Sequence, residues 1–188
     1  MLDTSTVTVV TALITGSVAL IGVYLTNYNN TKRLKLELEY NQTEKNRSNM
    51  IDKIEELYNL SDKWLKNIFM NYNNLILVME GKIDYNEYLD LIINRKGDDL
   101  NFSRLEMLLH MYFNNLIPFY KEVANLRDIG NDISHKYKLE YENGNFDSRE
   151  FIQPFLKIQK DIINSGEVFK QEIIRKATKI WNLNLNIY

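Results

Sequence analysis

The chain contains no cysteine, and its 188 residues include only 7 glycines and 2 prolines. The absence of cysteine excludes disulfides, thiolate catalysis and Cys-ligated metals, and it fits a reducing compartment. So few helix breakers predict long helices. A formal net charge of −2 excludes a strong general attraction to nucleic acid. Phosphate-binding loops, dinucleotide fingerprints and metal-ligand spacings are also missing, so we expect neither a cofactor nor a metal.

Residues 4–26 form an uncharged apolar run of the length that crosses a bilayer. At 100° per residue its small and hydroxyl side chains fall on one arc, which we call the small-residue face. That face consists of Thr4, Ser5, Thr8, Thr11, Ala12, Thr15, Gly16, Ala19, Gly22 and Thr26. Lipid surrounds a lone anchor evenly and demands no such sorting. The pattern therefore predicts a helix that meets other helices or water, and hence a homo-oligomer.

Two interpretations of the small-residue face remain open. In the first, its hydroxyls line a narrow water path, with Asp3 at the outer mouth and Lys32 and Arg33 at the inner one. In the second, the face only lets helices pack tightly, and each threonine hydroxyl bonds back to its own backbone.

The charges around this run predict its topology. Its start carries Asp3 in place of a basic region, and it lacks a small-residue cleavage site, so we expect an anchor and not a cleaved signal peptide. Lys32, Arg33 and Lys35 follow the run. By the positive-inside rule, the C-terminal part is expected in the cytoplasm, with membrane lipid around a single span.

The remaining residues predict an all-α fold, because apolar positions recur at steps of three and four. We expect a transmembrane helix over 1–30 that continues into a stalk helix over 31–47, followed by an antiparallel helical bundle over 48–180 and a tail over 181–188. The helices expected within the bundle are 48–80, 84–94, 103–116, 118–138 and 147–179. Gly81 should end the first of them, and Asp84 and Ser103 should cap the next two. The loop at 95–99, the turn at 143–145 and a strand-like alternation in the tail complete the prediction.

Two polar segments are candidate binding sites. Arg127, Asn131 and His135 follow at steps of four and share one helix stripe, which could bind a phosphodiester and use His135 as a general acid or base in RNA cleavage. Alternatively, the stripe is a solvated face with local ion pairs. The last helix carries basic residues that could receive a nucleotide, RNA or anionic headgroups, or could simply be solvated. They are Lys157, Lys160, Lys170, Arg175, Lys176 and Lys179.

An arginine followed by His135 and, two places on, by Tyr137 resembles the signature of the HEPN ribonucleases. That signature places four to six residues between arginine and histidine. Here seven residues separate Arg127 from His135, and Gly130 occupies the arginine position of the shortest spacing. A single span joined to such a degenerate HEPN-like bundle is similar to the membrane accessory proteins of type VI-B CRISPR systems. The resemblance implies a HEPN-like bundle and a membrane pore in phage defence.

Together these observations predict an oligomeric single-span effector of the bacterial inner membrane that forms a pore or perturbs the membrane, gated by its cytoplasmic bundle. It is not expected to be an enzyme. One alternative is a membrane-tethered HEPN-like ribonuclease that uses Arg127, Asn131 and His135. Another is a non-catalytic membrane scaffold. The expected partners are a nucleic-acid or nucleotide signal, or a protein of the same defence system.

Overall fold

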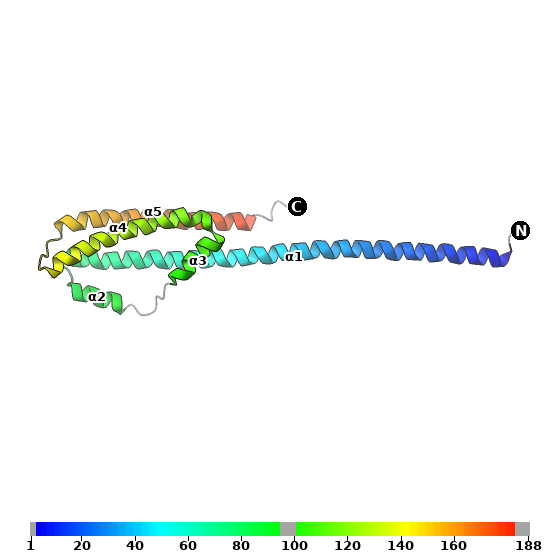
Figure 1. Ribbon diagram of the computed structural model, residues 1–188, viewed down its shortest axis with the longest axis horizontal. Helices are drawn as coiled ribbons and strands as arrows, with labels where there is room; N and C mark the ends of the chain where they lie inside the picture. Colours follow the sequence, from blue (N-terminus) through cyan, green and yellow to red (C-terminus); the bar gives the residue numbers. More distant parts are fainter. Residues whose placement is uncertain (1–2, 95–100, 183–188) are drawn as a thin grey trace. The chain divides into compact units, whose positions relative to one another are not determined.

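A computed structural model describes residues 3–94 and 101–182, and every regular element in those ranges is helical. The all-α prediction is therefore confirmed for this part of the chain. The helices labelled in Figure 1 are α1 (Thr4–Met79), α2 (Tyr85–Ile93), α3 (Phe102–Tyr112), α4 (Ile117–Glu142) and α5 (Arg149–Asn182). The 3-10 turn η1 (Asn114–Leu116) lies between α3 and α4 in the chain. The chain divides into two units, Met1–Asn49 and Met50–Tyr188.

Helix α1 is continuous over 76 residues. The span therefore continues into the stalk, as expected, but the prediction of a second helix that begins near residue 48 is wrong. The polar patch at 27–31 is helical, and the Thr31 hydroxyl donates to the Asn27 carbonyl at 2.8 Å. The reason is local. Neither glycine nor proline occurs between residues 23 and 80, and asparagines alone lower helix propensity by only a few tenths of a kcal/mol each.

Gly81 ends α1, as predicted. Its φ of 67° is in the left-handed region that favours glycine. The Gly81 amide donates to the Val78 carbonyl and the Lys82 amide to the Leu77 carbonyl, both at 2.9 Å. This pair of bonds is a Schellman motif, which satisfies two carbonyls that the helix end would leave unpaired.

The second unit, residues 50–188, is built around the C-terminal part of α1. Apolar side chains at steps of three and four along α1 face α3, α4 and α5. Trp64 of α1 meets Tyr120 of α4 with ring centroids 5.0 Å apart, and Tyr72 of α1 meets Phe155 of α5 at 4.7 Å. Trp64 and Phe155 are at most 1% exposed. Burial of such large rings supplies most of the stability of a helical bundle of this size.

The helix ends agree with the predictions only in part. The Asp84 capping box with Glu87 at α2 is confirmed. The expected cap at Ser103 is wrong, because Asn101 caps α3 and its side-chain oxygen accepts from the Arg104 amide at 2.9 Å. Asparagine is as good an N-cap as serine, so the sequence alone did not decide whether α3 begins after residue 101 or after residue 103. Helix α3 ends at Tyr112 and not near 116, and α4 continues past 138 to Glu142. The expected loop at 95–99 lies outside the described residues.

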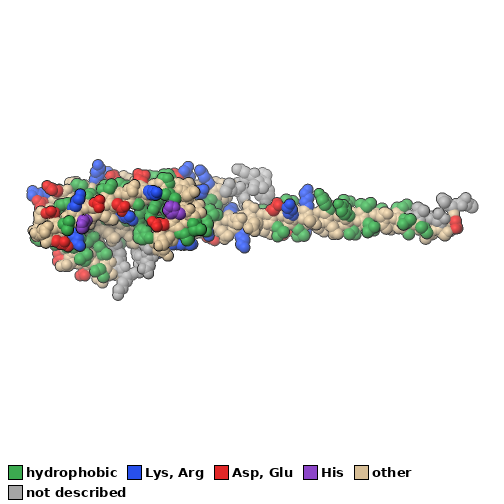
Figure 2. Space-filling model, in the orientation of Figure 1, with side chains coloured by type: hydrophobic (Ala, Val, Ile, Leu, Met, Phe, Trp, Pro, Cys, Tyr) green, Lys and Arg blue, Asp and Glu red, His purple; other side chains and the backbone are tan. Residues whose placement is uncertain are grey.

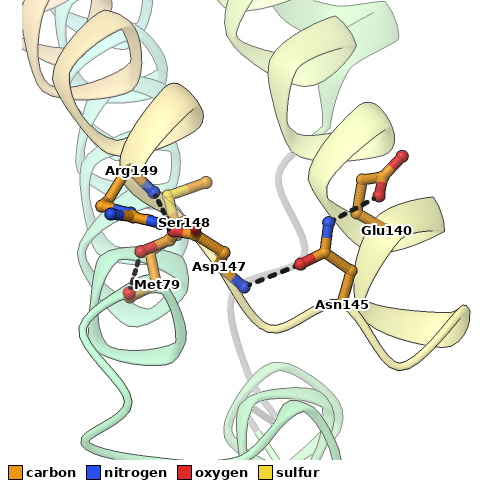
Figure 3. Close-up of polar contacts among 6 residues, drawn as sticks. All are labelled: Met79, Glu140, Asn145, Asp147, Ser148 and Arg149. Carbon is orange, nitrogen blue, oxygen red and sulfur yellow. Dashed lines mark hydrogen bonds and ion pairs between the residues drawn. The ribbon is translucent and has the colours of Figure 1, made fainter.

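The connection from α4 to α5 also closes the end of α1 (Figure 3). Gly144, with a φ of 80°, turns the chain out of α4. The Asn145 amide group then donates to Glu140 at 2.9 Å, and the Ser148 hydroxyl donates to the Met79 carbonyl at 2.5 Å. That carbonyl belongs to the last turn of α1 and has no partner within its own helix. One serine thus joins the start of α5 to the end of α1.

The tail differs from its prediction in part. Trp181 and Asn182 belong to α5, so the expected boundary at residue 181 is wrong by two residues, and the strand-like pattern does not hold for these two. An apolar–polar alternation this short does not overcome the helix that precedes it. Residues 183–188 lie outside the described part of the chain.

Buried tyrosines make the second unit sensitive to alkali. Burial, helped by the neighbouring Tyr88 and Glu142, raises the pKa of Tyr85 from 10.0 to about 12. Burial also raises the pKa of Tyr72, Tyr88 and Tyr137. A tyrosine whose pKa is higher in the folded than in the unfolded protein favours the folded state. Its contribution to the free energy of unfolding is complete below the unfolded pKa of 10.0 and is lost as pH rises toward 12.

We therefore expect the second unit to lose helix between pH 10 and 12, together with ionisation of these tyrosines. Tyrosinate absorbance and circular dichroism, recorded on one sample, measure both events. A titration in which all 12 tyrosines ionise while the helix content stays constant would contradict this expectation.

Candidate functional site

One helix, α1, is long and apolar enough to cross a membrane, judged by its length and composition, and none of its apolar window is buried. Residues 4–31 are 28 consecutive residues without a charge, which span about 42 Å as a helix at 1.5 Å per residue. Green hydrophobic side chains recur along this part of α1 in Figure 2. Leu13 and Leu20 are 66% and 74% exposed. So much exposed apolar surface needs lipid or another protein to cover it.

The small-residue face forms a shallow groove on this segment. The groove is lined by Thr8, Thr11, Ala12, Thr15, Gly16 and Ala19. Ser5, Gly22 and Thr26 are exposed and lie outside the groove lining, and the Thr4 side chain is outside the described part of the chain. A Cβ built on Gly16 or Gly22 meets no heavy atom within 4 Å. The face is therefore free to receive another helix at close range.

Three hydroxyls of this segment bond back to the backbone of their own helix. Thr15 donates to the Thr11 carbonyl at 2.9 Å and Thr26 to the Gly22 carbonyl at 2.8 Å. Ser17, on the opposite side, donates to the Leu13 carbonyl at 2.8 Å in the same way. The protons of these three hydroxyls are thus satisfied without water, and only their oxygen lone pairs remain to meet water or a partner. This geometry is compatible with dry helix packing as well as with a water path.

Charged residues stand at both ends of the uncharged segment. Asp3 accepts a hydrogen bond from the Ser5 hydroxyl at 2.5 Å, which holds the carboxylate beside the first turn of α1. Lys32 and Arg33 are exposed on α1 at the other end. Charges at these positions fit the two edges of a membrane-spanning helix.

The second candidate site separates into two parts on α4. Arg127 and Asn131 both line a cavity of about 770 Å3 in the second unit, which we call the bundle cavity. His135 is exposed and is not among the residues that line it. The Arg127 guanidinium pairs with Asp128 at 2.7 Å, and its Cζ lies 5.9 Å from the centre of the Trp64 ring. Steps of four keep the three residues on one stripe, but the bundle covers only part of that stripe.

Gly130, the position at which the shortest HEPN-like spacing would place an arginine, packs closely against Tyr72. A Cβ built at this position would lie 2.7 Å from the Cε2 and Cζ atoms of Tyr72. The Tyr72 ring packs on Phe155, and its hydroxyl donates to the Arg127 carbonyl at 2.7 Å. Tyr72 therefore occupies the space that an arginine side chain at this position would need.

The bundle cavity was not predicted from the sequence. Its walls come from α1, α2, α3, the residue before α3, and α4. They consist of Trp64, Asn67, Ile68, Asn71, Tyr72, Leu75, Tyr88, Ile92, Asn101, Phe102, Arg127, Asn131 and Ser134. One signal could have pointed to it. Asn67 and Asn71 lie beside the apolar positions Ile68 and Tyr72 on α1, where a simple core helix would carry no amide.

The basic residues of α5 differ in their surroundings. Lys170 is half-buried and pairs with Glu167 at 2.6 Å and Asp62 at 3.6 Å, and the Glu167 hydrogen bond raises the pKa of the lysine. Arg175 pairs with Glu172 at 2.5 Å. Lys157, Lys160 and Lys179 are exposed, and Lys176 is partly exposed. Because Lys170 and Arg175 are each paired with a carboxylate, they offer less net charge to an anion than the sequence suggested.

Comparison with known proteins identifies no relative. The chain matches no protein-family model, no curated protein and no solved structure. Within residues 3–94 and 101–182, moreover, no group of three or more His, Asp and Glu side chains could hold a metal ion. The exposed apolar helix and the bundle cavity are therefore the features of this chain that bear on its function.

Proposed function

We propose that this chain is a single-span membrane protein that self-associates through the small-residue face, and that the assembly perforates or perturbs the membrane under control of its helical bundle. One observation carries the proposal. The exposed apolar segment of α1 has bulky aliphatic side chains on one side and a groove of Thr8, Thr15, Gly16 and other small residues on the opposite side. Lipid accommodates the first side, and another helix fits the second.

Self-association follows from the physics of packing in lipid. Lipid tails are as apolar as leucine, so transmembrane helices gain little from apolar contact alone. Close approach of two backbones, which Gly16 and Gly22 permit, adds van der Waals contact. Oxygen lone pairs of Thr15 and its neighbours add polar contact across helices. A monomeric anchor would use neither feature.

The finer parts of the proposal have separate supports. The number of hydroxyls in the small-residue face supports perforation of the membrane. The alternative is that the helices pack together without a water path. A cytoplasmic bundle draws on Lys32 and Arg33 after the span. A role in phage defence, in the bacterial inner membrane, draws only on the resemblance to accessory proteins of type VI-B CRISPR systems.

Replacing the glycines of the small-residue face with a bulky residue tests the proposed assembly. Gly16→Leu and Gly22→Leu should each convert the detergent-extracted oligomer into smaller species, because a leucine there separates the backbones. Light scattering of the full chain in detergent measures the mass of the particle. Ser17→Leu is the control, since Ser17 lies on the opposite side of the helix at 100° per residue. Unchanged mass in both glycine variants would remove the small-residue face from the interface.

A further inference from the structure

The bundle cavity has the size and composition of a small-molecule site. Its volume of about 770 Å3 lies in the range of ligand pockets, which run from ~300 to 1,000 Å3. Its described walls carry four aromatic rings, Trp64, Tyr72, Tyr88 and Phe102. They also carry four side-chain amides, Asn67, Asn71, Asn101 and Asn131. Rings and amides together favour a planar ligand with polar edges.

Two of these residues contain buried polar atoms that lack a partner. Trp64 is 1% exposed, and its Nε1 donor has no hydrogen-bond acceptor among the described residues. Asn67, one helical turn further along α1, has a buried Oδ1 acceptor that likewise has no donor there. An unpaired buried group costs about 1–3 kcal/mol, so native proteins seldom retain one without a reason. Both residues line the cavity, and the edge of a nucleobase presents an acceptor that Nε1 needs as well as a donor that Oδ1 needs.

The charge of the cavity adds a second requirement. Arg127 is the only charged residue among the described residues of its walls. Its present partner is Asp128, whose side chain is 62% exposed, and an ion pair so open to solvent contributes little. A phosphate could therefore replace Asp128 on the guanidinium, which binds phosphate through two parallel hydrogen bonds. A cationic ligand would instead be repelled by Arg127.

We propose that the bundle cavity binds a mononucleotide, with the base among the aromatic rings near Trp64 and Asn67 and the phosphate on Arg127. A purely apolar ligand would leave Nε1 of Trp64 and Oδ1 of Asn67 unpaired. A long nucleic-acid strand needs a row of cations along its backbone, which one arginine does not provide. The inference supplies the controlling ligand of the proposed function, and it rests on that function for its biological role only.

Calorimetric titration of the full chain in detergent tests the assignment, with AMP, GMP, CMP and UMP as probes. At least one of them should bind, and its nucleoside should bind more weakly. Arg127→Gln should weaken the nucleotide by about tenfold and leave the nucleoside unchanged, because only the phosphate contact is lost. Asn67→Leu should weaken both. The control is Arg149→Gln, which removes another carboxylate-paired arginine, one that does not line the cavity, and should change neither affinity.

A second measurement keeps the test valid if Asn67→Leu does not fold. The chain has two tryptophans, so Trp181→Phe leaves Trp64 as the only reporter, and nucleotide binding should change its fluorescence. Binding of none of the four nucleotides would overturn the proposal. So would equal competition by inorganic phosphate, tighter binding of a hexa-adenylate than of AMP, or an affinity that Arg127→Gln leaves unchanged. Since binding is measured without current or particle mass, its failure is distinct from failure of membrane assembly.

Discussion

Thr15→Leu is expected to reduce the ion current of the reconstituted protein by roughly tenfold or more, because an added apolar side chain dries a narrow path and closes it to ions. Thr15 lines the groove of the small-residue face. If that groove faces water in the oligomer, leucine fills it with hydrocarbon. The measurement is conductance in a planar bilayer, with equal amounts of inserted protein.

Ser17→Leu is the matched control for this prediction. Both hydroxyls donate to the carbonyl four residues earlier, Thr15 at 2.9 Å and Ser17 at 2.8 Å, so both changes remove the same kind of bond. Both also make the span more hydrophobic. They differ in the side of the helix on which the leucine appears, and Ser17→Leu should leave the current unchanged. Equal currents from wild type and both variants would exclude a path along the small-residue face and favour dry packing.

Gly130→Ala should lower the free energy of unfolding by about 2 kcal/mol, a typical cost of overpacking a core. Alanine in a helix normally stabilises by up to ~1 kcal/mol over glycine, so the sign itself is informative. The added methyl would lie 2.7 Å from two ring atoms of Tyr72. Tyr72 is held by Phe155 and by its bond to the Arg127 carbonyl, so it cannot move aside without losing those contacts.

Gly166→Ala provides the comparison, measured in the same chemical denaturation series. Gly166 is also a buried glycine inside a helix, and its Cβ would lie 2.8 Å from a Leu65 methyl group. That methyl is the end of a flexible, partly exposed side chain, which can rotate away. We therefore expect a change close to zero. A stabilising Gly130→Ala would mean that Tyr72 moves aside easily and that its ring does not exclude a side chain at position 130.

Several features could be predicted from the sequence alone because they depend on interactions between residues close together in the chain. The uncharged run, the capping box at Asp84 and the turns at Gly81 and Gly144 all depend on residues a few positions apart, and the structure has each of them. Where local signals competed, the sequence was less decisive. Asn101 and Ser103 were equally suitable caps for α3, and the asparagine-rich patch at 27–31 could have been a break or a helix.

Only the tertiary structure decided which faces meet. Periodicity places Arg127, Asn131 and His135 on one stripe of α4, but the rotation and offset of α4 against α1 depend on packing at many contacts at once. Tyr72 lies against Gly130, and Trp64 lies below Arg127, although more than fifty positions separate the members of each pair. Arg127 and Asn131 consequently line a cavity and His135 faces solvent. A helix pattern shows which side of a helix is buried, whereas the shape of the neighbouring side chains determines what that side encloses.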